Sequence, residues 1–557
     1  MTIDRNATTT ALTAAALALA LVYLVAGVAA MLGAPRVPYA DQWLFYARLI
    51  EQPIGSYAFA AENGHREVLP KLLRWIELRQ FDADQSLQIG LGLLFAVATL
   101  SVLAWTAWRA EVPRAHRVAV MLVATIGIFW LGNERALAHS NDAIHAYLVT
   151  FFLCAGLILV ARPCANELPR ALLATLCALA ATFSFGSGIA AFPALLFVLA
   201  MRRAPARAWW PVATGFAVAL LLYLSGDPAA TTTTVRFDPL TQVALGLHWL
   251  ASPLVYVFWP LLDADIAGRL PSGVVRETSV AIAAAWTSTF GDIRRSTVPQ
   301  AIAGGLGVAT FAGLAWQAWR ARSATPAAVR IALGIAWFGL VVGAVIALTR
   351  AAYFEQHADQ IQAPRYLVWS SLFWSGTAMA LLLHVRGARV ALIGALTIAV
   401  LLLPSEAWMG RLAQSMRSTA EQTALGGVVG VLDHREPLGE TPFDTMRATL
   451  PLLEREHVAM HAWPEASWLG RQLPADRWRP IEATNVAVEP IDNRFDGPGV
   501  RITANADDAA ARLVVLDANG MAIGLLMRDP MRDREVWRGW ARGTPDAASM
   551  RVVAGDD

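Results

Sequence analysis

Acidic, basic and imidazole side chains are concentrated between the first two apolar segments of the chain, in residues 34–86. The residues there that could do chemistry are Asp41, Glu62, Asn63, His65, Arg66, Glu67 and Lys71. A carboxylate can act as a general base on a hydroxyl group or bind a divalent ion, and an arginine can bind a phosphate through two parallel hydrogen bonds. A simple connector needs none of these groups. The loop is therefore predicted to hold a charged, polar ligand at a membrane surface, the alternative being that Asp41 caps a helix and Arg66 meets lipid headgroups.

Two features of this loop would position its polar groups. Asp41 follows the first apolar segment directly and stands between Tyr39 and Trp43, which are aromatic residues suited to a membrane interface. Residues 68–81 are amphipathic, and their apolar residues at helical spacing are Leu69, Leu72, Leu73, Ile76 and Leu78. We expect this helix to lie along the membrane plane. Asp41 and residues 62–66 would then lie together at a common rim of the bundle, at the membrane surface.

A second polar group lies between two apolar segments, in residues 133–145. Its members are Asn133, Glu134, Arg135, His139, Ser140, Asn141, Asp142 and His145. Asn141 and His145 are four residues apart, so on a helix they share a face. A solvated turn is the alternative interpretation.

A third polar group precedes a later apolar segment. Its members are Arg350, Tyr353, Glu355, Gln356, His357, Asp359, Gln362, Arg365 and Tyr366. Arg365 and Tyr366 open the segment, so the guanidinium group is expected at the interface, where it could hold the phosphate of a lipid-linked donor or only reach lipid headgroups.

Residues 184–188, SFGSG, favour a tight turn over a break that allows close backbone approach.

The composition indicates a membrane protein. Of the 557 residues 56% are hydrophobic and 16% charged, whereas a soluble protein would carry roughly a quarter charged residues. We predict a mainly α fold, a polytopic transmembrane bundle of about 11 spans within a range of about 9–13. The predicted spans are residues 11–33, 87–107, 118–132, 147–161, 170–185, 188–201, 208–225, 301–318, 327–348, 366–384 and 389–404. Residues 240–290 hold two more apolar segments, either another membrane pair or helices at the interface.

Arginine placement orients the predicted bundle. With the N-terminus inside, the cytoplasmic loops would carry Arg109, Arg114, Arg117, Arg162, Arg170, Arg202, Arg203, Arg207, Arg320, Arg322, Arg330, Arg386 and Arg389. The other loops and the tail after Pro404 would face outward, and they hold almost all the acids, histidines and amides. Lys71 is the only lysine, a bias typical of GC-rich bacterial genes. We expect a bacterial inner-membrane protein with a cytoplasmic N-terminus and a periplasmic tail.

The tail differs in composition from the membrane region, which is taken as residues 1–405. It carries 23 acidic and 17 basic residues and no cysteine. Residues 406–470 are predicted to form a helical connector. Residues 471–557 alternate like strands, with Asp517, Ala518, Asn519 and Gly520 as a turn, and predict a β-sandwich-like module.

These features resemble the GT-C superfamily, polytopic glycosyltransferases that use polyprenyl-phosphate sugars. The resemblance covers residues 10–405 and rests on Asp41 after the first span, the amphipathic residues 68–81, Arg365 with Tyr366, and a C-terminal tail. The chain is also similar to bacterial membrane proteins of undefined function whose first loop reads DQW followed by N-x-H-R. Here these motifs are Asp41, Gln42 and Trp43, then Asn63, Gly64, His65 and Arg66. Many GT-C members have two adjacent acids where this chain has Asp41 followed by Gln42.

The resemblance implies a membrane glycosyltransferase that moves a sugar from a polyprenyl-phosphate donor to an envelope glycan, lipid or protein. The residues expected to be catalytic are Asp41, Glu62 and His65, with Asp41 and Glu62 as ligands if a divalent cation such as Mg²⁺ or Mn²⁺ takes part. Substrate and phosphate binding is expected at Arg66, Lys71, Asn141, His145, Arg365 and Tyr366. No nucleic-acid partner is expected. The alternatives are a transporter or flippase of lipid-linked glycans, which would need polar residues deep within the spans, and a non-catalytic scaffold of envelope-polysaccharide assembly.

Overall fold

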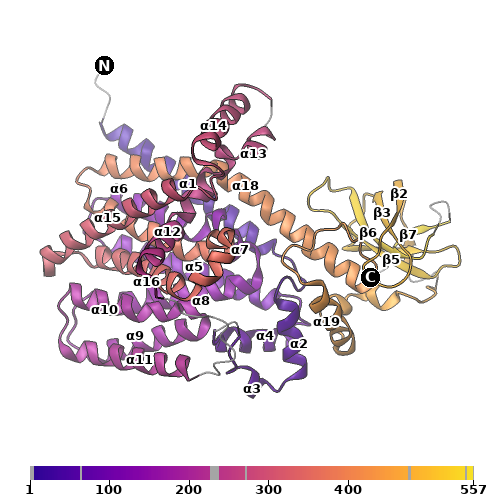
Figure 1. Ribbon diagram of the computed structural model, residues 1–557, viewed down its shortest axis with the longest axis horizontal. Coiled ribbons are helices and arrows are strands. Elements are labelled where there is room, and N and C mark those ends of the chain that lie inside the picture. Colours follow the sequence, from indigo (N-terminus) through magenta and orange to yellow (C-terminus); the bar gives the residue numbers. More distant parts are fainter. Residues whose placement is uncertain are drawn as a thin grey trace. The chain divides into compact units, whose positions relative to one another are not determined.

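The computed structural model describes residues 5–62, 65–225, 237–269, 272–474, 478–545 and 549–555 (Figure 1). Asn63 and Gly64 of the predicted loop motif lie outside these residues. The helices are α1 (Arg5–Leu32), α2 (Gln42–Glu51), α3 (Ile54–Tyr57), α4 (Val68–Gln80), α5 (Ser86–Trp108), α6 (Arg114–Phe129), α7 (Glu134–Ala138), α8 (Ser140–Ala161), α9 (Glu167–Ser184), α10 (Ala191–Met201), α11 (Ala206–Leu224), α12 (Pro239–Leu262), α13 (Ala264–Gly268), α14 (Val274–Phe290), α15 (Thr297–Ala321), α16 (Ala327–Gln356), α17 (Pro364–His384), α18 (Ala388–Val429) and α19 (Phe443–Glu456). The strands are β1 (Trp478–Pro480), β2 (Thr484–Ile491), β3 (Gly499–Asn505), β4 (Arg512–Leu516), β5 (Ala522–Arg528), β6 (Val536–Arg542) and β7 (Arg551–Gly555).

The chain folds into two compact units, and the first loop is divided between them. The first unit comprises Met1–Leu32, Phe59–Pro70 and Leu91–Gly410. The second comprises Gly33–Ala58, Lys71–Gly90 and Arg411–Asp557. Most of the loop that the sequence analysis assigned to the membrane region therefore folds with the tail, and only its middle folds with the membrane helices.

Among the described residues, nine helices are long and apolar enough to cross a membrane, which confirms the predicted polytopic bundle. They are Asn6–Leu32, Ser86–Trp108, Arg114–Ala138, Ser140–Ala161, Pro239–Gly268, Thr297–Ala321, Ala327–Gln356, Pro364–His384 and Ala388–Val429. The predicted spans at 170–185, 188–201 and 208–225 form α9, α10 and α11, which fall outside this set. In the region left open, α12 qualifies as a span and the 17-residue α14 does not.

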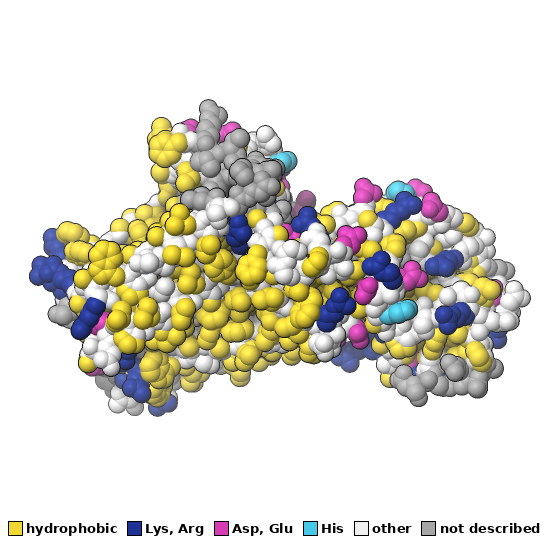
Figure 2. Space-filling model, turned by 90° about the horizontal axis from the view of Figure 1, so that it is seen from below, with side chains coloured by type: hydrophobic (Ala, Val, Ile, Leu, Met, Phe, Trp, Pro, Cys, Tyr) yellow, Lys and Arg dark blue, Asp and Glu magenta, His cyan; other side chains and the backbone are white. Residues whose placement is uncertain are grey.

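The helical unit exposes a large apolar surface, as a lipid environment requires. Figure 2 shows hydrophobic side chains covering most of the visible face of these helices. Leu21 on α1 and Leu94 on α5, for example, are 59% and 58% exposed. An apolar surface of this extent marks contact with membrane rather than with water.

The loops predicted on each side of the membrane meet one another within the first unit. At the C-terminal end of α8, Arg330 donates a hydrogen bond to the carbonyl oxygen of Ala161. Arg202 pairs with Glu167, the first residue of the next helix, α9. At its other end, His145 contacts Glu67 of the first loop. These contacts join loops that the arginine pattern placed on the same side, and the side of the membrane that each set of loops faces remains a prediction.

The tail contains the predicted β-rich module, and the predicted turn at 517–520 joins β4 to β5. Its seven strands form one sheet in the order β1-β7-β4-β5-β6-β3-β2, with every pair antiparallel. Successive residues point to opposite faces, so Leu513 and Val515 join one core cluster while Val514 and Leu516 join another. In the described part the strands belong to a single sheet, so the sandwich-like expectation holds for strand content rather than for two facing sheets.

The residue after Asp41 has a structural role in the second unit. Gln42 is 1% exposed; its side chain accepts a hydrogen bond from the Tyr39 backbone N–H (3.0 Å) and donates one to Gln85 (2.7 Å). Gln85 in turn donates to the hydroxyl of Tyr46 (2.8 Å). The amide of Gln42 therefore points inward and joins the two ends of the loop.

Helix α4 forms where the amphipathic pattern predicts it, but three of its four charged side chains are buried, and only Arg79 is exposed. Lys71 is fully buried, donates to the carbonyl oxygen of Tyr57 (3.1 Å) and lies over the ring of Tyr57. Arg74, also fully buried, lies over the ring of Phe45. Leu78 joins the core of the second unit, as an amphipathic helix would bury it.

Glu77 ties α4 to the first turn of α5. Its carboxylate accepts hydrogen bonds from the backbone N–H groups of Leu87 (3.3 Å) and Gln88 (2.8 Å). Burial nevertheless raises the pKa of Glu77 from 4.5 to about 7. A carboxyl group whose pKa is raised by folding stabilises the fold most at low pH, and this contribution is lost as the pH rises through the folded-state pKa.

We expect Glu77→Gln to remove this pH dependence. The wild type should lose up to about 3 kcal/mol of stability relative to the variant between about pH 4.5 and pH 7, since the amide stays neutral throughout. Thermal unfolding of the purified protein at pH 5 and pH 8 measures the difference. A gap between the two proteins that is the same at both pH values would contradict the assignment.

Candidate functional site

The first loop and the 133–145 loop meet through one buried pair. Oε2 of Glu67 lies 3.1 Å from Nε2 of His145, and the two residues are 5% and 6% exposed. Asn141, one turn before His145 on α8, is also buried. The structure therefore brings together polar residues from two loops that the sequence placed on the same side.

Phe185 lies between two imidazole rings at this point. The centroid of the Phe185 ring is 4.7 Å from that of His65 and 5.0 Å from that of His145. It is 6.1 Å from the centroid of the Trp369 ring. Burial lowers the pKa of His65 to about 4, an effect that Glu67 opposes and Arg350 and His145 assist. His65 is thus neutral at pH 7 and can exchange hydrogen bonds without bringing a positive charge.

Gly186 allows the backbone to approach this stack. A Cβ atom at this position would lie 2.2 Å from Nδ1 of His65, well inside van der Waals contact. The turn at 184–188 therefore brings its backbone close to His65. The sequence favoured a tight turn over such a close backbone approach. Only glycine leaves room for the imidazole there.

We expect Gly186→Ala to displace His65 and to lower any activity of the site by up to about 100-fold, the effect of moving a reacting group by about 1 Å. The activity assay described below measures it, with Gly55→Ala as the control because no atom lies within 4 Å of a Cβ at Gly55. Equal activity of the two variants would exclude a positional role for His65.

Arg66 ties the first loop to the membrane helices through its backbone. Its N–H donates to the hydroxyl of Tyr223 (3.4 Å), which donates to the carbonyl oxygen of Thr182 (3.2 Å). Its guanidinium group donates to the carbonyl oxygen of Phe59 (2.9 Å) at the exposed side. The backbone is thus fixed while the cationic group is at the surface, as a phosphate ligand requires.

Two more charged groups lie in the other polar loops. Asp142 pairs with Arg135 and lies 3.3 Å from Nδ1 of His139. Arg365, exposed at the start of α17, donates to Gln360 (2.9 Å) and lies over the ring of Tyr366. Arg365 therefore has the terminal position on its helix that the sequence predicted.

The two carboxylates and the amine predicted in the first loop are divided between the two compact units. Asp41 is exposed at the N-cap position of α2, the place that the helix-cap alternative gave it, although its side chain makes no capping hydrogen bond there. Glu62 is 5% exposed and forms a β-bridge with His65. Asp41 and Lys71 belong to the second unit and Glu62 to the first, so the common rim of Asp41 and residues 62–66 remains a prediction.

Within the part of the chain that the structure describes, no three His, Cys, Asp or Glu side chains group in a way that could hold a metal ion. Asp41 and Glu62, proposed as ligands from sequence, are in different units. Glu67, Phe185, Gly186 and Arg350 belong to segments that the sequence singled out, but they were not among the residues expected to be catalytic or to bind substrate. The signals for them were present, since each lies in a loop assigned to the same side of the membrane.

No family model and no curated protein matches this chain. One solved structure that resembles it is the archaeal oligosaccharyltransferase AglB from Archaeoglobus fulgidus, in complex with an inhibitory peptide and a dolichol-phosphate. The TM-score is 0.36 and the identity 14%, and the similarity covers 77% of this chain and 60% of that chain. The present chain therefore spans less than two thirds of that protein, and a similarity this low carries no argument about function.

Proposed function

We propose that this protein is a membrane glycosyltransferase that takes a sugar from a polyprenyl-phosphate donor. The observation that carries the proposal is the convergence of His65, Glu67 and His145 with the turn at Gly186, on the side of the membrane bundle where Arg350 also acts electrostatically on His65. Polar groups gathered at one end of a bundle suit a reaction at the membrane surface better than passage through it, which favours transfer over transport.

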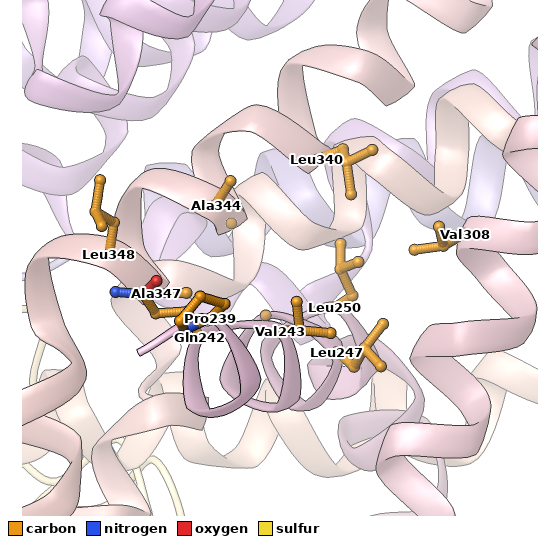
Figure 3. Close-up of a pocket in the computed structure, with 12 residues that line it drawn as sticks. Pro239, Gln242, Val243, Leu247, Leu250, Val308, Leu340, Ala344, Ala347 and Leu348 are labelled. Carbon is orange, nitrogen blue, oxygen red and sulfur yellow. The ribbon is translucent and has the colours of Figure 1, made fainter. Parts of the chain in front are cut away.

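An apolar cavity in the first unit supports a lipid-linked donor. It measures about 380 Å³ and lies between α12, α15 and α16, which are all candidate spans (Figure 3). Its lining includes Val243, Leu247, Val308 and Leu340, and Gln242 is its only side chain with a hydrogen-bonding group. An apolar lining of this kind suits a hydrocarbon chain such as an isoprenoid.

Arg350 links this cavity to the polar site. It follows Ala347 of the cavity wall by three residues on α16, and residues at this spacing share a helix face. A chain in the cavity would therefore direct its phosphate toward Arg350. In this proposal Arg350, Arg66 and Arg365 neutralise the phosphate, and Lys71 is left out because it is fully buried against Tyr57.

The proposed step is a single displacement. Asp41 accepts the proton of the acceptor hydroxyl, whose oxygen attacks the anomeric carbon of the donor. The bond from that carbon to the phosphate oxygen breaks, the polyprenyl phosphate leaves with the electron pair, and the configuration inverts. Neutral His65 hydrogen-bonds the reacting groups, Glu62 is the second carboxylate, and Asn141, His145 and Tyr366 border the substrate. The acceptor is an envelope glycan, lipid or protein, and the β-rich tail is a candidate for its recognition by analogy of fold alone.

The test uses the purified full-length protein in proteoliposomes with radiolabelled polyprenyl-phosphate sugars. We expect label to appear in an acceptor glycan, lipid or protein fraction together with free polyprenyl phosphate. Label that crosses the bilayer while still attached to its lipid would instead identify a flippase. Neither outcome, with the protein required for envelope-polysaccharide assembly in cells, would favour a scaffold.

A further inference from the structure

Four residues of the first unit carry buried polar atoms that have no hydrogen-bond partner among the described residues. These atoms are Nδ2 of Asn133, Oε1 and Nε2 of Gln362, Oε1 of Glu406 and Nε1 of Trp408. Asn133, Gln362 and Glu406 are only 1%, 5% and 7% exposed. A buried polar atom without a partner costs free energy, so several of them in one region point to a ligand.

Glu406 and Asn133 are fixed close to each other by their other polar atoms. The backbone N–H of Leu131 donates a hydrogen bond to Oε2 of Glu406 (2.8 Å). Asn133 ends the same 3₁₀ turn, Leu131–Asn133, and its Oδ1 accepts a hydrogen bond from the hydroxyl of Ser371 on α17 (2.9 Å). Each side chain is therefore held by one of its polar atoms while the second is left over.

Aromatic rings connect Trp408 to Gln362. The ring centroid of Trp408 is 6.4 Å from that of Trp259 on α12, which is 5.7 Å from that of Tyr256. The hydroxyl of Tyr256 donates a hydrogen bond to the backbone carbonyl oxygen of Gln362 (2.9 Å). Helix α12 also contacts the turn Leu131–Asn133. The four residues with leftover polar atoms therefore gather around one end of α12.

The leftover atoms are a mixture of donors and acceptors. Oε1 of Glu406 and Oε1 of Gln362 accept hydrogen bonds, whereas the amide nitrogens of Gln362 and Asn133 and the indole N–H of Trp408 donate them. An anion such as phosphate would need donors alone, and the carboxylate would repel it. Hydroxyl groups both donate and accept, so the mixture suits a neutral ligand with several hydroxyls. One buried water makes about 2–4 hydrogen bonds, fewer than these five atoms require.

The cluster adjoins the groups that the proposed function assigns to the donor phosphate. Gln362 precedes Arg365 by three residues, at the end of the 3₁₀ turn that leads into α17. Ser371, which holds Asn133, follows Trp369 by two residues on α17, and the ring of Trp369 stacks on Phe185 of the proposed site. A sugar attached to a phosphate near Arg365 would therefore meet these polar atoms.

We propose that Asn133, Gln362 and Glu406 bind the hydroxyl groups of a sugar ring, with the indole of Trp408 beside it. The identification of the ligand as a sugar rests on the proposed function. A pyranose of the donor and a pyranose of the acceptor share this hydroxyl chemistry. A site built to pair with hydroxyls rejects a ligand that lacks them, so the cluster would select the sugar-bearing lipid over the bare lipid phosphate.

The experiment measures equilibrium binding to the purified full-length protein in nanodiscs, with no acceptor present. The probes are a polyprenyl-phosphate hexose, the same polyprenyl phosphate without its sugar, and a free hexose disaccharide. The variants are Glu406→Gln and Gln362→Leu, and Gln414→Leu, at an exposed amide of α18, is the control. Gln362→Leu removes no side-chain hydrogen bond seen among the described residues, so it should fold even if Glu406→Gln does not.

We expect the wild type and the control to bind the hexose lipid more tightly than the bare lipid. Each variant should weaken binding of the hexose lipid by about 10-fold and leave that of polyprenyl phosphate unchanged, as the loss of a hydrogen bond to a charged or buried group predicts. The same loss seen with the disaccharide instead would assign the cluster to the acceptor sugar.

The inference would be overturned by a wild type that binds both lipids equally and no disaccharide, or by variants that keep the wild-type preference; the cluster would then hold water only. These results are separable from the proposed function. Transfer with unchanged kcat/KM in both variants would reject the cluster and keep the glycosyltransferase, whereas selective binding without any transfer would do the reverse.

Discussion

Asp41→Asn is expected to reduce sugar transfer by about 10²–10⁴-fold, the contribution of a general base. Asparagine has the same shape but cannot accept the proton of the acceptor hydroxyl. Because Asp41 is exposed and asparagine has nearly the same shape, the variant should remain folded. The measurement is transfer of labelled sugar by purified protein, with thermal unfolding recorded in parallel.

The matched control for this variant is Asp82→Asn, which alters another exposed carboxylate of the same loop. Asp82 has a positive φ of 49°, a conformation that asparagine also tolerates. Full activity of Asp41→Asn, alone and combined with Glu62→Gln, would remove both carboxylates from the proposed step. Treatment with EDTA tests the divalent ion separately, since lost activity that Mg²⁺ or Mn²⁺ restores would assign these carboxylates to a metal.

Breaking the pair of Glu67 and His145 is expected to have the largest effect on stability. Glu67→Ala should lower the free energy of unfolding by about 3 kcal/mol, because it leaves a buried imidazole without its carboxylate. His145→Ala should cost a similar amount, and the double variant less than the sum of the two. Unfolding midpoints of the three variants provide this cycle, and strictly additive losses would show that the pair contributes nothing.

A conservative variant separates a chemical role of this pair from a structural one. Glu67→Gln keeps a hydrogen-bond acceptor for His145 but removes the negative charge that raises the pKa of His65. If the charge matters, the pH profile of transfer should shift to lower pH while the protein remains folded. An unchanged profile would limit Glu67 to holding the two loops together.

The sequence predicted those features that depend on local pattern. Apolar length identified most of the spans, and arginine placement put the loops of Glu67 and His145 on one side, which agrees with the contact between these two residues. The alternation of residues 499–528 predicted strands and their turn. These signals survive because each depends on only a few neighbouring residues.

Features that depend on distant partners were not predictable. The amphipathic pattern of α4 assumes that charge faces water, and Lys71 and Arg74 face inward because Tyr57 and Phe45 provide aromatic rings for them. Gly186 looks like any turn glycine until the ring of His65 is placed against it. The division of the first loop between two units also leaves no mark in composition, since it follows from long-range packing.

The hydrogen bonds of Gln42 determine how freely the first loop can change in length. The side chain of Gln42 is hydrogen-bonded to that of Gln85, and this bond holds the two ends of the loop together whatever the length of chain between them. The exposed residues Gln52 and Pro53 lie between these two ends of the loop and take no part in the bond that joins them. An epitope tag inserted at this position would lengthen the loop without shifting Asp41 relative to the start of α5. Accessibility of such a tag to antibody would therefore show which side of the membrane the loop occupies.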